Sequence, residues 1–447
     1  MRYTQITQEQ TSRMLTAIGA ASVDELFKGI SHEHRARGAI KLPGGLSEPE
    51  LMAELESLSG RNKACSDDEM VCFLGGGVYD HFSPTVVNDL AMQSAFLTAY
   101  TPYQAEASQG LLQLFYEFQT LVCQLTGMDV ANASLYEHAS AVAEAVQIAC
   151  AATKRRRVLM SRAIHPDAYR VAQTQTYEQD LELVPLPIDG GVTDAGALGA
   201  ALNEETAAVV VQSPNFFGQI ESVAELADLA HGAGALLIQS ADPISCAILK
   251  RPATLGADIA AGEAQPLGIP MAYGGPLCGF LACREAHLRR MPGRIVGMTR
   301  DADGKRAFCL TLQTREQHIR RERATSNICT NQGLLATRVT IHTAAMGRSG
   351  LRQVAQLCVN KSRYAAARIA ELDGYRLKFA GPFFREFVVQ SDRPVRNVLD
   401  HCQGRGIAAG VPLGGWFPEL KDCFLIAVTE KRSRLQIDAL ADALKSV

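Results

Sequence analysis

Among the candidate functional residues, Asp242 has the sequence context that most clearly predicts a position at a ligand-binding site. It follows an apolar run at residues 235–240 that reads as a strand, and open α/β sheets bind ligands beyond the carboxyl ends of their strands. A carboxylate at that edge could pair with the cationic ring nitrogen of a cofactor. Asp242 and Pro243 also fit a helix start, with an aspartate cap and proline at the first helical position. Both roles stay open at this point.

A second candidate is an anion site at the start of a long helix. Residues 132–134 (Asn-Ala-Ser) precede a helix that we predict from Glu137, and free backbone N–H groups at such a start can bind a phosphate. Ser134 and Glu137 have the spacing of a capping box, however, and a capping box would occupy those groups. A carboxylate there would also repel a phosphate dianion. The sequence therefore predicts a helix start that suits a phosphate poorly.

Residues 99–106 form an aromatic loop, interrupted by proline, before a helix predicted at 110–125. Its side chains Tyr100, Tyr103 and Gln104 could contact a small substrate or another subunit, because tyrosine combines a rigid ring with a polar tip. The alternative is a surface loop that its two tyrosines anchor to the core.

The densest cationic stretch runs from residue 311 to 331. Arginine forks there could bind a carboxylate, a phosphate or an acidic partner. A run of mixed charge is more often a solvated helix face. His318 has no second histidine or paired carboxylate at ligand spacing, so we expect no metal site. The candidate residues of this stretch are Arg315, Arg320, Arg323, Thr325 and Asn327.

The elements that must position these residues follow an α/β pattern from about residue 67 to 345. Short apolar or β-branched runs alternate with amphipathic helical stretches, which is typical of a sheet with crossover helices. Helices are expected at 137–153 and 223–233. The predicted strands are 158–161, 181–185, 207–212, 235–240, 258–261 and 279–283.

Two smaller regions flank this large α/β domain. Residues 1–66 carry three helix starts, namely Thr7 with Gln10, Ser22 with Glu25 and Ser47 with Glu50, and form an N-terminal helical arm. Residues 346–447 combine a helix, two strands and two further helices, which indicates a small α+β C-terminal domain.

Composition bounds the class of protein. The chain has 447 residues, 47% of them hydrophobic, so it can bury a sizeable core. A formal net charge of -3 argues against nucleic-acid binding. The twelve cysteines are scattered without ligand-like spacing, as expected of buried thiols in a reducing compartment. No stretch has the roughly 18 to 20 apolar residues of a membrane span, so we expect a cytoplasmic protein.

Several segments together resemble one family, the P-protein of the glycine cleavage system (glycine decarboxylase), in its N-terminal half. In that family the loop at residues 262–276, with Gly274 and Gly275, corresponds to the loop that bears the cofactor-binding lysine. The resemblance places Gln265 at the lysine position, and an amide forms no Schiff base. His138 stands where the family leads us to expect a small residue. The resembling segments are 73–79, 100–110, 132–144, 257–276 and 311–331.

The resemblance implies a pyridoxal-phosphate-dependent transferase-like large domain with a mixed, mostly parallel seven-stranded sheet. It also implies a homologous subunit 2 that carries pyridoxal phosphate on its lysine, with two copies of each chain in the assembly. Together the subunits would decarboxylate glycine and pass the aminomethyl group to the lipoyl arm of H-protein. This chain would hold no covalent cofactor and would be inactive alone.

Two other hypotheses remain. The chain could be an autonomous pyridoxal-phosphate enzyme that uses another lysine, of which Lys250 is nearest in sequence, although it precedes the strand at 258–261 instead of following it. It could also be a non-enzymatic scaffold on a degenerate fold, because fold alone does not fix function.

Overall fold

The computed structural model describes residues 5–35, 41–65, 69–97, 101–272 and 274–447. The chain divides into two compact units, Met1–Lys63 and Ala64–Val447. Among the described residues, no helix is both long enough and apolar enough to cross a bilayer.

The first unit consists of short helices that bury nothing. The structure has α1 (Gln8–Ala17), a 3-10 helix (Val23–Phe27) and α2 (Glu48–Ser59), none with a buried residue. Thr7 and Ser47 form the predicted capping boxes, and Ser22 caps the 3-10 helix. The first unit ends at residue 63, whereas the sequence placed the end of the arm at residue 66.

The second unit is built on a mixed sheet of seven strands, as the family resemblance implied. Every pair is parallel except those of β10, which runs antiparallel to both β9 and β2. The two-residue strand β2 was missed, because so short a run carries no periodic signal. In order across the sheet the strands are β2 (Val130–Ala131), β10 (Gly279–Cys283), β9 (Ile259–Glu263), β8 (Leu236–Ala241), β7 (Thr206–Ser213), β3 (Arg157–Ser161) and β4 (Glu182–Leu186).

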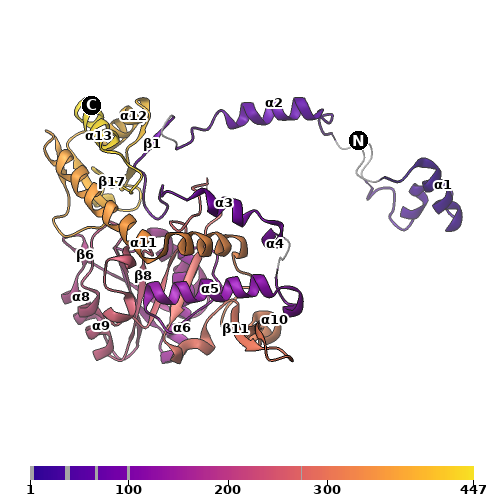
Figure 1. Cartoon of the computed structure of the whole chain (residues 1–447), viewed down its shortest axis with the longest axis horizontal. Helices are drawn as coiled ribbons and strands as arrows, with labels where there is room; N and C mark the ends of the chain where they lie inside the picture. Colours follow the sequence, from indigo (N-terminus) through magenta and orange to yellow (C-terminus); the bar gives the residue numbers. More distant parts are fainter. Residues whose placement is uncertain (1–4, 36–40, 66–68, 98–100, 273) are drawn as a thin grey trace. The chain divides into compact units, whose positions relative to one another are not determined.

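Helices cover both faces of this sheet. In β3, Leu159 faces one core and its neighbours Val158 and Met160 face the other, as the two-residue repeat of a strand requires. The helices on the Leu159 side are α5 (Gln109–Thr126), α8 (Ala195–Ala201), α9 (Val223–Gly232) and the first part of α11 (Gly333–Ala370). The helices on the other side are α6 (His138–Thr153) and α7 (Pro166–Thr176). Figure 1 shows α5 and α11 side by side.

The C-terminal residues form a second sheet that α11 reaches. Gly347, with φ 58° and ψ -177°, interrupts α11 close to the predicted domain boundary at 345/346. That boundary stays a prediction, since residues 64–447 form one compact unit. The sheet has the strands β13 (Tyr375–Leu377), β14 (Glu386–Ser391), β17 (Cys423–Ala427) and β16 (Val411–Pro412), with the helices α12 (Val395–Gly404) and α13 (Arg434–Lys445).

Smaller elements complete the second unit. The helices α3 (Thr85–Ala91) and α4 (Ser94–Leu97) both contact α11. Three pairs of strands lie outside the two sheets: β1 (Val71–Cys72) with β15 (Ile407–Ala408), β5 (Ile188–Asp189) with β6 (Val192–Thr193), and β11 (Ile295–Arg300) with β12 (Arg306–Thr311).

Gly218, in the loop after β7, lies in tight contact with the first residue of β14. Its φ is +82°, and a Cβ there would lie 1.9 Å from the backbone oxygen of Glu386. We expect Gly218→Ala to lower the free energy of unfolding by about 3 kcal/mol or more, because it adds overpacking to an unfavourable backbone conformation. Gly199→Ala, on α8 with open space around it, is the matched control and should be neutral or stabilising by roughly 0.5 kcal/mol. Urea unfolding of both variants measures the difference, and equal midpoints would contradict the tight approach.

Candidate functional site

A small cavity lies at the carboxyl edge of the main sheet. Its wall comes from the ends of β7, β8 and β9 and from residues 77–79 and 384–386, and its volume is about 50 Å³. That space holds a few water molecules, well below the roughly 300 Å³ of a typical ligand pocket. The lining residues are Gly77, Tyr79, His138, His165, Gln212, Pro214, Gly218, Ser240, Ala241, Asp242, Pro243, Glu263, Pro266, Phe384, Arg385 and Glu386.

Of the two roles that the sequence left open for Asp242, the structure shows a cap-like backbone contact, although the 3-10 helix itself begins only at Ser245, and the cation that Asp242 meets belongs to the chain itself. One carboxylate oxygen accepts from the backbone N–H of Ser245 at 2.7 Å, as a helix cap does. The other pairs with the guanidinium of Arg385, which is buried. The position that could face a cofactor's ring nitrogen is therefore occupied by an arginine.

Arg385 joins three further groups at this centre. Its guanidinium lies 3.4 Å from the ring centroid of Tyr79 and donates to Nε2 of His81 at 2.8 Å. Glu386 accepts from the Tyr79 hydroxyl at 2.8 Å and from the Gly76 N–H at 2.7 Å. Burial raises the pKa of Glu386 above its ordinary value, while the charge of Arg385 opposes that rise. Cation and carboxylates thus satisfy one another without any ligand.

The start of α6 is closed by carboxylates. Glu137 is the helix cap and accepts from Ser140 N–H at 2.9 Å, while Glu263 accepts from His138 N–H at 3.1 Å. Glu263 also accepts from the N–H groups of Gln265 and Cys278. Burial raises the pKa of Glu263 to about 7, and the three N–H bonds oppose that shift by favouring the charged form. Carboxylates therefore occupy the N–H groups of His138 and Ser140 at this helix start.

The predicted capping box of Ser134 with Glu137 is wrong. The chain stays extended after β2, and the Leu135 N–H bonds to the Gly279 carbonyl, so the helix begins only at His138. Ser134 has a φ of 107° and accepts from the Gln332 N–H at 3.0 Å. The pairing with β10 delays the helix start beyond what the local spacing indicated.

His138 and His165 occupy the cavity as neutral rings. Nε2 of His138 lies 2.7 Å from the Ser240 hydroxyl, and burial lowers the pKa of His138 to about 3. His165 accepts from the Asp167 N–H through Nδ1 and donates to the Gly76 carbonyl through Nε2, which fixes its tautomer. Burial also lowers the pKa of His165. Both rings fill space next to the start of α6.

Gln265 is a structural link. Its side chain is buried, accepts from the Tyr79 N–H at 3.0 Å, and donates to the carbonyls of Tyr79 at 3.0 Å and Ile269 at 2.8 Å. The amide therefore fastens residue 79 to the loop that the resemblance equates with the lysine loop. Gly274 and Gly275, farther along this loop, have φ values of 82° and 122°, which only glycine adopts easily.

The other predicted residues gather elsewhere. Arg294, which is buried, donates to the Tyr103 hydroxyl at 3.0 Å and pairs with Glu316 at 3.1 Å. Arg315 donates to the carbonyls of Met291 and Gly293, so it holds backbone in place. Gln104, Arg320, Arg323, Thr325 and Asn327 are exposed, and Tyr100 lies outside the described residues.

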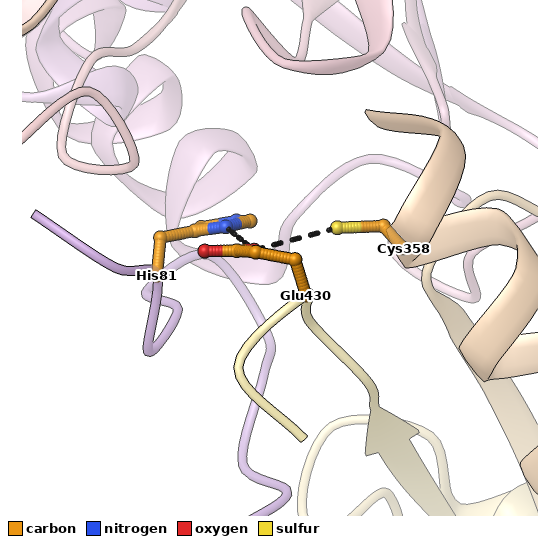
Figure 2. Close-up of side chains that lie close together, drawn as sticks. All are labelled: His81, Cys358 and Glu430. Carbon is orange, nitrogen blue, oxygen red and sulfur yellow. Dashed lines mark hydrogen bonds and ion pairs between the residues drawn. The ribbon is translucent and has the colours of Figure 1, made fainter. Parts of the chain in front are cut away.

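Figure 2 shows a cluster of three potential metal ligands, His81, Cys358 and Glu430, whose ligand atoms lie within 4.8 Å of one another. Nε2 of His81 accepts from Arg385, so Nδ1 carries the proton and donates to Glu430 at 2.6 Å. A metal would need the lone pair at that same nitrogen. Burial also raises the pKa of the Cys358 thiol far above its ordinary value. The cluster fits a hydrogen-bonded chain and does not fit a metal ion.

The sequence pattern missed most of the cavity wall. Arg385 precedes β14 and Glu386 is its first residue, in a different part of the chain, and Tyr79 and His165 lie in loops. Glu263 alone carried a signal, as a carboxylate that ends an otherwise small and apolar strand.

The fold and this edge of the sheet define a member of the pyridoxal-phosphate-dependent transferase-like class. A sphingosine-1-phosphate lyase of Burkholderia pseudomallei shares the fold, with a TM-score of 0.69 at 16% identity over 92% of each chain. A cysteine desulfurase from Escherichia coli also shares it, with a TM-score of 0.64 at 13% identity over 87% of this chain and 97% of that one. At these identities the likeness concerns the fold alone.

The family follows from closer relatives. The model of the glycine cleavage system P-protein matches residues 1–444. The chain is 48% identical to the probable glycine dehydrogenase (decarboxylating) subunit 1 of Moorella thermoacetica over the full length of both. A crystal structure of glycine decarboxylase (P-protein) in inhibitor-bound form superposes with a TM-score of 0.91 at 41% identity, covering both chains fully. The chain belongs to the glycine cleavage system P-protein family.

The residues of this chain do not fit the cofactor of that fold class. Among the described residues no lysine lines the cavity, and Lys250 is exposed on a loop. The helix start is capped by Glu137 and Glu263, and Arg385 takes the carboxylate of Asp242. The groups that would meet the phosphate and the ring nitrogen of a phosphorylated pyridine aldehyde are thus bound to other groups of the chain.

We expect Gln265→Ala to lower the free energy of unfolding by about 3 kcal/mol, because it strands two carbonyls and one N–H in the interior. Gln356→Ala removes one exposed hydrogen bond on α11 and should change stability by roughly 0.5 kcal/mol at most. Thermal and urea unfolding of the two variants give the comparison. A Gln265→Ala variant as stable as Gln356→Ala would show that the amide is dispensable.

Proposed function

We propose that this chain is subunit 1 of a glycine dehydrogenase (decarboxylating), and that a homologous subunit 2 binds pyridoxal phosphate on its lysine. The two subunits would decarboxylate glycine and pass the aminomethyl group to the lipoyl arm of H-protein, in an assembly with two copies of each chain. The named relatives that match over the full chain are subunits 1 of such an enzyme. A cytoplasmic location is part of this proposal.

One observation supports the proposal that subunit 2, and not this chain, binds the cofactor. The large domain keeps the sheet edge of the cofactor fold, while its Schiff-base position holds Gln265 in three hydrogen bonds. Selection for cofactor binding in this chain would have kept a lysine and an open helix start. The chain therefore supplies structure and a wall to the partner's active site, and its own centre does no covalent chemistry.

The isolated chain should form no Schiff base with pyridoxal phosphate. We expect borohydride reduction to leave no pyridoxyl group on any lysine, by peptide mass spectrometry, and glycine–bicarbonate exchange to require subunit 2. Gln265→Lys should still give no exchange alone, because Glu137, Glu263 and Arg385 keep the phosphate and ring positions closed. A stoichiometric adduct on Lys250 or any other lysine of the wild-type chain would revive the autonomous enzyme.

Arg320 and Arg323 are proposed to meet the acidic lipoyl carrier. Both are exposed, and Arg320 has neither an ion pair nor a hydrogen bond through its guanidinium to the rest of the described chain. In the assembled enzyme, Arg320→Glu with Arg323→Glu should raise the KM for H-protein about fivefold. Arg396→Glu, which reverses one exposed arginine on α12, is the control for charge reversal at a distant surface and should leave that KM unchanged. Unchanged kinetics in the double variant would favour a solvated face instead.

A further inference from the structure

We infer that the exposed apolar surface of α3 and α4 binds the cofactor-bearing partner subunit, an inference that rests on the proposed function. This α3–α4 surface consists of large apolar side chains on the two helices, on the residues next to them and on the first turn of α11. Their exposed fractions are Phe82 58%, Val86 42%, Leu90 43%, Met92 56%, Leu97 45% and Leu334 45%. Figure 1 shows α3 and α4 along α11, which both helices contact.

The exposed side of helix α3 carries apolar as well as polar side chains. Val87 and Ala91 are completely buried beneath it, while Val86 and Leu90, four residues apart, share a flank turned to solvent beside the exposed Thr85, Asn88 and Asp89. A helix at a protein surface normally carries polar residues on its outer side. An exposed valine and leucine on one flank, next to the other apolar side chains of the α3–α4 surface, are expected where another chain covers that flank.

The same segment is depleted of charge. Residues 82–97 contain one charged side chain, Asp89, in a chain where 20% of residues are charged. Depletion of charge marks the centre of protein interfaces, and permanent interfaces are the most apolar. A permanent subunit therefore fits this surface better than a carrier that binds and leaves, and the relatives of this chain are named as one subunit of an enzyme.

The surface is held in place before any partner binds. Arg338 on α11 donates to the Asn88 side chain at 3.2 Å and to the Gly268 carbonyl at 3.2 Å. One side chain thus ties α3 to α11 and to the loop that follows Gln265. Because α3 is fixed in this way, the partner can dock without the cost of ordering the helix.

The test is the affinity of the full-length chain for subunit 2. In Val86→Glu with Leu90→Glu, two carboxylates would be buried without partners, so we expect binding to weaken about tenfold or more in sedimentation velocity. Leu435→Glu is the control, because it places the same charge at an apolar residue of α13 that is 82% exposed, and its affinity should match the wild type. Thermal melting checks that all variants fold as the wild type does.

Each outcome decides the inference. Weakened binding in the double variant alone supports it. If the wild type binds subunit 2 and the double variant binds it with the same affinity, the α3–α4 surface is not the binding site, and the proposed function is unaffected. A wild-type chain that does not bind subunit 2 overturns both. If the double variant only abolishes self-association of the chain, the surface belongs to a second copy of this chain and the inference is wrong.

Discussion

The centre of this structure depends on one buried cation, the guanidinium of Arg385. It pairs with Asp242 at the end of β8, donates to His81 and lies over the ring of Tyr79. These partners come from two distant parts of the chain, residues 79–81 and Asp242, so the guanidinium joins the main sheet to the C-terminal sheet. A charge buried this deeply is tolerable only when carboxylates and hydrogen bonds surround it. Here Asp242 and Glu386 supply that surrounding.

An internal ion pair at this edge of the sheet has a functional consequence. In the fold class, the same edge is where a cofactor's charges meet the protein. This chain brings its own cation to Asp242 and its own carboxylates to the start of α6, so the site is electrostatically complete. The resemblance places Gln265 at the lysine position, and in the structure its side chain links residue 79 to the loop at 265–269 by hydrogen bonds.

Because the polar groups at this centre bind one another, the surfaces of the chain are left for contacts with partners. The N-terminal unit buries none of its helical residues, and α3 and α4 expose apolar side chains, while Arg320 and Arg323 are exposed in a polar stretch. Apolar and charged surfaces of this kind serve different contacts, because burial favours permanent partners and exposed charge favours fast, reversible ones. The two surfaces are consistent with the proposed function, in which the chain assembles permanently with one protein and binds another transiently.

The sequence by itself predicted most of the strands and helices, because most strands are short apolar runs and most helices repeat their apolar residues over several turns, whereas the seven-stranded sheet was implied by the family resemblance. That resemblance also aligned the loop that places Gln265 at the lysine position, which stays a prediction. The tertiary structure decided what fills the site. Arg385 lies 143 residues from Asp242, and Glu386 lies more than 300 residues from Tyr79. Local patterns contain information only about neighbours in sequence. They predicted a capping box for Ser134, which strand pairing prevents. They also suggested that Arg315 could bind an external anion, whereas its guanidinium donates to nearby backbone carbonyls.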